Sequence, residues 1–176
     1  MAALTFLALL ISKGASNSLL LAMISLGFGT VIPLAVLYCL VRRGIIRDMC
    51  VSERKSRVVA FAGTILSYLL GGIGLLLARA PSIVTAAMLC YLGNALVLML
   101  ISLKWKISVH ASGITGPATV LSYSMGMSAL VLFGLAIPVG WARTKLGAHT
   151  LAQVLAGALL AIVITWLQLE AYLMVL

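Results

Sequence analysis

The sequence contains several uncharged apolar runs that are each long enough to cross a lipid bilayer. A helix of about 20 residues covers a hydrocarbon core of about 30 Å. Three runs reach this length at residues 18–41, 58–78 and 82–103, and a fourth extends over 148–176 with one acidic residue inside it. Since 64% of the residues are apolar and 9% are charged, no stretch is polar enough for a separate water-soluble domain. We therefore expect one all-α domain over residues 1–176, a polytopic membrane helical bundle.

Residues 111–141 also lack charge, but they are rich in glycine and proline. Pro117 and Pro138 stand among several glycines, so one straight helix of this length is disfavoured. We expect a hairpin of two short helices that turns near Gly126, with arms of about 14 residues that fall short of a core of about 30 Å. The bundle then has about six transmembrane helices. The run at residues 2–11 is too short to span, and its role stays open between an interfacial helix, a half-helix and a signal-segment remnant.

Basic residues gather in three loops that six crossings place on one side of the membrane. All but two of the twelve Lys and Arg residues lie in these loops, and the exceptions are Lys13 and Arg79. The positive-inside rule assigns the charged side to the cytoplasm and both ends of the chain to the outside. Lys and Arg residues that bind an anionic ligand are counted by this rule as well. The assignment therefore rests on the large excess of Lys and Arg on one side over the other. We expect an integral protein of the cell (plasma) membrane with its functional side in the cytoplasm.

The chain has only two histidines, His110 and His149, and both lie in or beside the basic loops. His110 follows Lys106, and His149 follows Arg143 and Lys145 just before the last apolar run. Ionisable side chains at a membrane interface are costly to bury, so two histidines next to cations are a candidate functional site. The alternative is that each histidine is a hydrogen-bonded packing residue.

The combination of imidazole, guanidinium and ammonium groups favours phosphate chemistry over metal binding. Arg and Lys match phosphate oxygens, and free N–H groups at helix N-termini add to such a site. A neutral imidazole can attack phosphorus while a second, protonated imidazole donates to the leaving oxygen. Two histidines without a nearby carboxylate or thiolate fall short of a usual ligand set, so we expect no metal and no cofactor. The three widely spaced cysteines are expected to be packing residues: Cys39, Cys50 and Cys90.

At these residues the sequence resembles the type 2 phosphatidic acid phosphatase superfamily of integral-membrane enzymes. The superfamily carries three motifs, Lys-x6-Arg-Pro, Pro-Ser-Gly-His and Ser-Arg-x5-His-x3-Asp. Arg143 and His149 have the spacing of the third motif. Ser108 and His110 keep the serine and the histidine of the second motif, without its proline and glycine.

The first motif is the weakest of the three matches. Arg47 and Arg54 have its spacing, with Lys55 in place of the proline. The same cluster, which continues to Arg57, resembles an Arg-x-x-Arg version found in divergent members beside a Lys-x-Ser-x-His second motif. The motif region covers residues 47–157, in the order and on the one side of the bundle that the superfamily has.

The resemblance implies a role for each matched residue. His149 is the implied nucleophile, which forms a phosphohistidine, His110 is the acid that protonates the leaving group, and Arg143 binds the phosphate in the catalytic centre. Four further residues of the first two motifs are implied to hold the phosphate oxygens: Arg54, Arg57, Lys106 and Ser108. The implied reaction is metal-independent hydrolysis of the phosphate or diphosphate headgroup of a membrane lipid of the polyprenyl phosphate, polyprenyl diphosphate or phosphatidate type.

Two positions depart from the superfamily pattern. Ala142 replaces a serine, which removes one hydroxyl donor, and Gln153 replaces the aspartate behind the nucleophile. Four residues after His149 on a helix, the Gln153 carbonyl can still accept the Nδ1 proton and leave Nε2 free. It lacks the negative charge that stabilises an imidazolium, so we expect a loss of about 1–3 kcal/mol, or about ten- to hundredfold in rate.

Two other functions stay open. A catalytically weak or inactive protein that binds or translocates lipid phosphates would keep the basic site without needing His149. A channel or transporter would fit helices broken by glycine and proline, but the spans lack acidic relay residues and an evident inverted repeat. Nucleic-acid binding is excluded as a function because the loops are too short to fold into a reader. The expected partners are the bilayer and a lipid phosphate, and the lipid tail and oligomeric state are undetermined.

Overall fold

The structure is a computed structural model that describes residues 1–14, 17–49, 51 and 53–176, without the side chains of Arg54 and Lys55. This part of the chain is helical and contains no strand, which confirms the predicted all-α fold. The helices, in chain order, are α1 (Ala2–Lys13), α2 (Ser18–Leu26), η1 (Gly27–Val31), α3 (Ile32–Arg42), α4 (Arg54–Leu77), α5 (Ser82–Lys104), α6 (Val109–Met125), η2 (Met127–Leu135), α7 (Ala136–Lys145) and α8 (Leu151–Val175).

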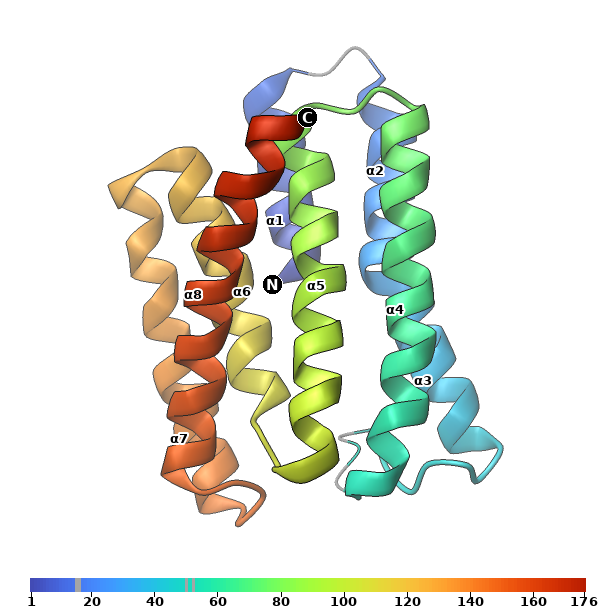
Figure 1. Ribbon diagram of the computed structural model, residues 1–176, viewed down its shortest axis with the longest axis vertical. Coiled ribbons are helices and arrows are strands. Elements are labelled where there is room, and N and C mark those ends of the chain that lie inside the picture. The colour runs from blue at the N-terminus through green and yellow to red at the C-terminus, as the bar shows by residue number, and fades with distance from the viewer. Residues whose placement is uncertain (15–16, 50, 52) are drawn as a thin grey trace.

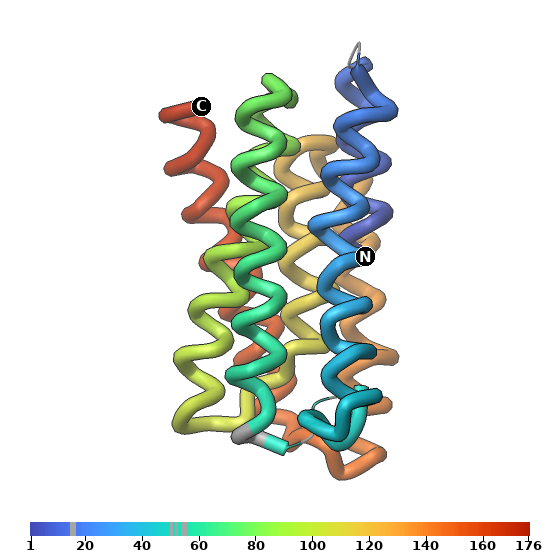
Figure 2. Tube along the Cα trace, turned by 90° about the vertical axis from the view of Figure 1, so that its right-hand side faces the viewer, coloured from blue at the N-terminus to red at the C-terminus, as the bar shows by residue number. Residues whose placement is uncertain are grey.

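The long helices stand side by side in an up-and-down bundle (Figure 1), which Figure 2 shows from the side. Within the described residues, five segments are long and apolar enough to cross a membrane: Ser18–Arg42, Ser56–Leu77, Ser82–Lys104, Met127–Lys145 and Leu151–Val175. The four spans expected from the apolar runs are confirmed. The fifth segment belongs to the hairpin, whose other arm, α6, has 17 residues.

The three basic loops lie at one end of the bundle, as the parity of the crossings predicts. Figure 1 shows the α3–α4, α5–α6 and α7–α8 connections together at the lower end, opposite the α1–α2 and α4–α5 connections. This arrangement brings the two histidine-bearing segments to the same end of the molecule. The sequence-based assignment of that end to the cytoplasm stays a prediction.

The predicted hairpin is present and turns at Gly126, whose φ of 80° favours glycine. The expectation that neither arm is long enough to span is wrong for the second arm, Met127–Lys145, which has 19 residues. The helix continues past Trp141 to Lys145, and its first nine residues form the 3-10 helix η2. A 3-10 helix rises about 2.0 Å per residue, more than an α-helix, so this arm gains length.

The segment from α2 to α3 is one continuous span with a π-helical centre at Gly27–Val31. Pro33 follows this centre and has no N–H to give to the carbonyl four residues before it. A π-helical turn is a usual way to accommodate such a break.

Helix α1 is a half-helix inserted into the bundle, which is one of the three roles left open by its sequence. Its first residue lies about halfway along the bundle (Figures 1 and 2). Phe6, Leu9 and Leu10 are buried in the main hydrophobic core, together with residues of α5 and with Leu169 of α8. Burial on this face holds α1 inside the protein instead of on the membrane surface.

The cysteines differ in environment. Cys90 is buried in the core, as predicted, whereas Cys39 is exposed on the outside of α3, so the packing role predicted for Cys39 is wrong. The face of α3 that carries Cys39 contains no residue buried in the protein and is available to lipid. Cys50 lies outside the described residues.

Helices α6 and α8 pack closely, and this contact positions the functional end of the bundle. A Cβ atom at Gly157 of α8 would lie 2.5 Å from the carbonyl oxygen of Ser108, so only glycine allows this approach. The hydroxyl of Ser112 donates to the carbonyl of Gly157 at 2.8 Å, and that of Thr115 donates to Ala158 at 3.0 Å. The N-termini of the two helices, beside which His110 and His149 lie, are thereby fixed relative to each other.

Candidate functional site

The loop between α7 and α8 closes on itself and joins Arg143 to His149. Gly147, with a φ of 62°, turns the chain after α7. The backbone N–H groups of Ala148 and His149 then both donate to the carbonyl of Arg143, at 3.1 and 3.2 Å. The five-residue spacing in the sequence is therefore the length of a hydrogen-bonded turn that holds these two residues together.

The imidazole of His149 is fixed by two oxygen acceptors. Its Nδ1 lies 3.2 Å from the carbonyl oxygen of Lys106 and 3.2 Å from Oε1 of Gln153. Since both neighbours accept hydrogen bonds, we assign the ring proton to Nδ1, which leaves a lone pair on Nε2. The contact with Gln153 agrees with the prediction from its four-residue spacing. The Lys106 carbonyl was not predicted, because a backbone acceptor has no signature in the sequence.

Gln153 has a second role at the start of α8. Its Oε1 also accepts from the backbone N–H of Thr150 at 3.2 Å, and its own backbone N–H donates to the Thr150 hydroxyl at 3.3 Å. This is a capping box, in which two otherwise unpaired donors of the helix N-terminus are satisfied. The Thr-x-x-Gln pattern carries this signal, but the sequence reasoning assigned Gln153 only to the histidine.

Arg57 ties the start of α4 to the segment before α6. Its guanidinium is buried, with 4% of the residue exposed. Nη1 donates to the carbonyl of Ile107 at 3.0 Å, and Nε donates to that of Val51 at 3.2 Å. The predicted phosphate ligand Arg57 thus lies at the site, and two of its donors are used to hold the surrounding backbone.

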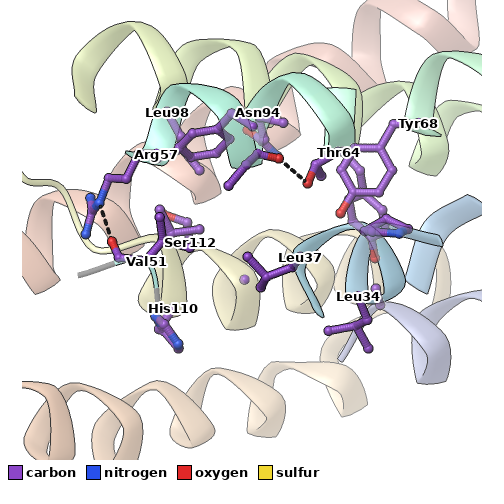
Figure 3. Close-up of a pocket in the computed structure, with 18 of the residues that line it drawn as sticks. Leu34, Leu37, Val51, Arg57, Thr64, Tyr68, Asn94, Leu98, His110 and Ser112 are labelled. Carbon is purple, nitrogen blue, oxygen red and sulfur yellow. Dashed lines mark hydrogen bonds between the residues drawn. The ribbon is translucent and has the colours of Figure 1, made fainter. Parts of the chain in front are cut away.

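His110 is the second residue of α6 and is exposed to a cavity that Arg57 also lines. Figure 3 shows both side chains at the same end of this cavity. Partial burial, followed by the positive charge of Arg143, lowers the pKa of His110 to about 4, and His149 and Arg57 act in the same direction. His110 is therefore neutral at pH 7 beside these cations. Arg57 and His149 also approach the same short segment, because they contact the neighbouring carbonyls of Ile107 and Lys106.

The pKa of His149 is also lowered, chiefly by burial and further by Arg57 and Lys106. The hydrogen bonds to Gln153 and to the Lys106 carbonyl act in the opposite direction. Because the lowered pKa keeps the ring neutral at pH 7, Nε2 is a nucleophile in its reactive form. Cations beside a neutral imidazole also give the site a positive potential that suits an anion.

The other predicted residues differ in where the structure places them. Ser108 is fully buried and its Oγ accepts from the backbone N–H of Ala111 at 3.4 Å, so it caps α6. The predicted contact between Ser108 and phosphate stays a prediction, because this hydroxyl oxygen accepts a hydrogen bond here and its own O–H group is a separate donor. Arg143 is in the last turn of α7 and Lys106 is partly buried near His149. The side chain of Arg54 lies outside the described residues.

Among the residues that the structure describes, no group of three His, Cys, Asp or Glu side chains could hold a metal ion. No family model, curated protein or solved structure matches the chain. The site itself consists of a fixed imidazole, a second imidazole, the buried Arg57 and the partly buried Arg143 and Lys106, at one end of a membrane bundle.

Proposed function

We propose that this protein is an integral-membrane, metal-independent lipid phosphatase, a divergent relative of the type 2 phosphatidic acid phosphatase superfamily. The observation that carries the proposal is the hydrogen bonding of His149, whose Nδ1 faces two acceptors while Nε2 stays free. Such an arrangement orients an imidazole for nucleophilic attack. The positive surroundings, supplied by Arg57 and Arg143, match the charge of a phosphate group.

The reaction consists of two displacements at phosphorus. Nε2 of His149 attacks the phosphorus atom, and the bond from phosphorus to the lipid oxygen breaks as His110 gives that oxygen a proton. The products of this step are a phosphohistidine and a lipid alcohol, or a lipid monophosphate when the substrate is a diphosphate. Water then attacks the phosphohistidine, His110 takes the water proton, and cleavage of the phosphorus–nitrogen bond releases inorganic phosphate.

His110 must be protonated for the first step, although its pKa is about 4 beside the cations. A bound phosphate dianion neutralises the charges of Arg57 and Arg143 and adds its own negative charge, so it raises this pKa. We therefore propose that substrate binding brings the proton onto His110. The acid is formed only when a phosphate occupies the site.

Location at the lipid headgroup level favours lipid substrates over soluble ones. The site lies at an end of the bundle, where the apolar spans finish and the basic loops begin. A phosphate can reach this level while its hydrocarbon tail stays in the bilayer or in the protein. We propose that the enzyme acts in the cell membrane with this end toward the cytoplasm, on polyprenyl phosphates, polyprenyl diphosphates or phosphatidate.

The proposal is tested by measuring phosphate release from a panel of lipid phosphates by the detergent-purified protein in EDTA. Release should persist under chelation and disappear in His149→Ala and His110→Ala. Arg143→Ala should lower release by about a hundredfold or more, since a charged donor to the transition state is lost. Arg43→Ala, an exposed arginine at the end of α3, is the charge-matched control and should keep full activity.

If the folded wild-type protein releases phosphate from none of the lipids, the proposed phosphatase activity is refuted. Binding of the same lipids, unaffected by His149→Ala, would then identify a lipid-phosphate-binding or lipid-translocating protein. The specific observation in favour of this second function is Gln153, which offers His149 a hydrogen bond without a negative charge.

A further inference from the structure

A cavity of about 410 Å³ extends from His110 and Arg57 into the interior of the bundle. Its walls come from α3, α4, α5 and α6. Figure 3 shows Arg57 and His110 at one end and Tyr68 and Leu34 at the other. Arg57 and Tyr68 are eleven residues apart on α4, so the cavity is about 16 Å long at the helical rise of 1.5 Å per residue.

Aromatic side chains and α1 border the inner end of the cavity, beside Leu34, which is 54% exposed. Tyr68 and Tyr91 line it, with ring centroids 5.9 Å apart, and Ala2 of α1 lines it beside them. Phe6 of α1 packs edge-to-face behind Tyr91, at 5.4 Å between centroids. The inserted half-helix α1 and these two tyrosines therefore form one wall at the end of the cavity.

The shape and polarity of the cavity fit a single hydrocarbon chain. Its sides are mainly apolar, with Leu37, Phe61 and Leu98 among the lining residues. A volume of about 410 Å³ over about 16 Å corresponds to a mean cross-section of about 25 Å², which suits one extended hydrocarbon chain. The one cationic end, at Arg57, is complementary to an anionic headgroup.

We propose that this cavity binds the headgroup-proximal part of a single-chain lipid phosphate, and that α1 with Tyr68 and Tyr91 limits the chain length. The inference rests on the proposed phosphatase function and names its substrate class. A phosphate at His149 and His110 directs the attached chain inward along α4, until its end meets the aromatic wall. Two-chain glycerolipids cannot place both chains in this cavity.

The first test measures kcat/KM for octyl, dodecyl and hexadecyl phosphate at a fixed surface fraction in mixed micelles. An extended dodecyl chain is about as long as the cavity, so it should be the best substrate of the wild type. Ala2→Trp shortens the cavity and should lower the dodecyl-to-octyl ratio about tenfold, the expected cost of excluding about two methylene groups from an apolar site. Tyr68→Ala opens the inner end and should raise the hexadecyl-to-dodecyl ratio by a similar factor.

Leu4→Trp is the matched control, because it places the same side chain on the outer face of α1, where Leu4 is 62% exposed. It should leave all three ratios unchanged. The proposal is overturned if the two cavity variants keep the wild-type ratios, or if phosphatidate is hydrolysed as efficiently as dodecyl phosphate. If Ala2→Trp fails to fold, the chain-length ratios of Tyr68→Ala test the proposal by themselves. This substitution enlarges the cavity and forces no atom into a filled space.

A second test separates the cavity from catalysis. Dodecyl phosphate with a terminal diazirine is photolysed with the wild-type protein, and the labelled peptides are identified by mass spectrometry. Label at Tyr68, Tyr91 or the start of α1, suppressed by excess dodecyl phosphate and by Ala2→Trp, supports the cavity even if no phosphate is released. Label confined to lipid-facing positions such as Leu69 and Leu77 would refute it, whatever the activity.

Discussion

At the scale of single residues, the site depends on how His149 and His110 are charged. Both pKa values are lowered, chiefly by burial and further by nearby cations such as Arg57, and His149 is held by the carbonyl of Lys106 and the amide of Gln153. A neutral acceptor behind the nucleophile orients it but stabilises the imidazolium less than a carboxylate does. The identity of residue 153 should therefore control both turnover and its pH dependence.

Replacement of Gln153 separates orientation from charge. Gln153→Leu removes the acceptor and should lower turnover about ten- to hundredfold. Gln153→Glu keeps the length and the cap, adds a negative charge and should raise the pKa of His149, so the acidic limb of the pH–rate profile moves to higher pH. Thr150→Ala is the control, because it breaks the capping box alone and should cost about 1 kcal/mol of stability. Equal turnover in Gln153→Leu and the wild type would exclude this role.

The low pKa of His110 predicts that acid destabilises the protein. The unfolded chain takes up a proton near the ordinary value of 6.5, whereas the folded site resists protonation down to about 4. Stability is therefore lost as the pH falls from about 6.5 toward 4. Thermal unfolding in detergent should show this loss, and it should be smaller in His110→Asn. Millimolar inorganic phosphate should restore stability in the wild type, and an unchanged acid slope in His110→Asn would contradict the assignment.

At the scale of elements, short glycine-dependent contacts place the functional groups. Gly157 lets α8 approach the carbonyl of Ser108, and Gly147 turns the chain so that His149 returns to Arg143. Neither glycine carries chemistry itself. Their effect is to fix the distance between helix ends that hold the histidines.

A pair of matched glycines tests the turn. Gly147 and Gly44 both have a left-handed φ, 62° and 70°, and a Cβ at either would meet no other atom within 4 Å. Gly147→Ala and Gly44→Ala should each cost about 1 kcal/mol of stability, the strain of alanine in this conformation. Only Gly147→Ala should also lower phosphate release, by about tenfold or more, because it shifts His149 relative to Arg143. Equal activities in the two variants would show that the turn does not position the site.

At the scale of the whole molecule, the bundle separates a basic end from an almost uncharged end. The three loops between α3 and α4, α5 and α6, and α7 and α8 share the basic end with the histidine site (Figure 1). The other end carries Lys13 at the end of α1 and Arg79 in the turn between α4 and α5. The cytoplasmic assignment rests on this difference in charge between the two ends. It is tested directly by measuring which end of the bundle faces the cytoplasm.

Cysteine labelling in intact cells measures the orientation. In a background with the three natural cysteines replaced by serine, Lys145→Cys should resist a membrane-impermeant maleimide until the cells are opened. Arg79→Cys, at the opposite end, should react from outside. The reverse pattern would place the histidine site outside the cell and would overturn the cytoplasmic assignment without affecting the chemistry of the site.

The apolar runs by themselves determined the membrane bundle, because spans near the length of the bilayer core must form helices that satisfy their own backbone. The spacing of Arg143, His149 and Gln153 also followed from the sequence, since all three lie within one turn and the helix that follows it. Contacts between distant segments were decided only by the tertiary structure. They include the bond from His149 to the Lys106 carbonyl, the capping role of Ser108 and the insertion of α1 behind the cavity. Each depends on how helices pack against one another, and a backbone carbonyl or a buried face brought in from elsewhere leaves no local pattern.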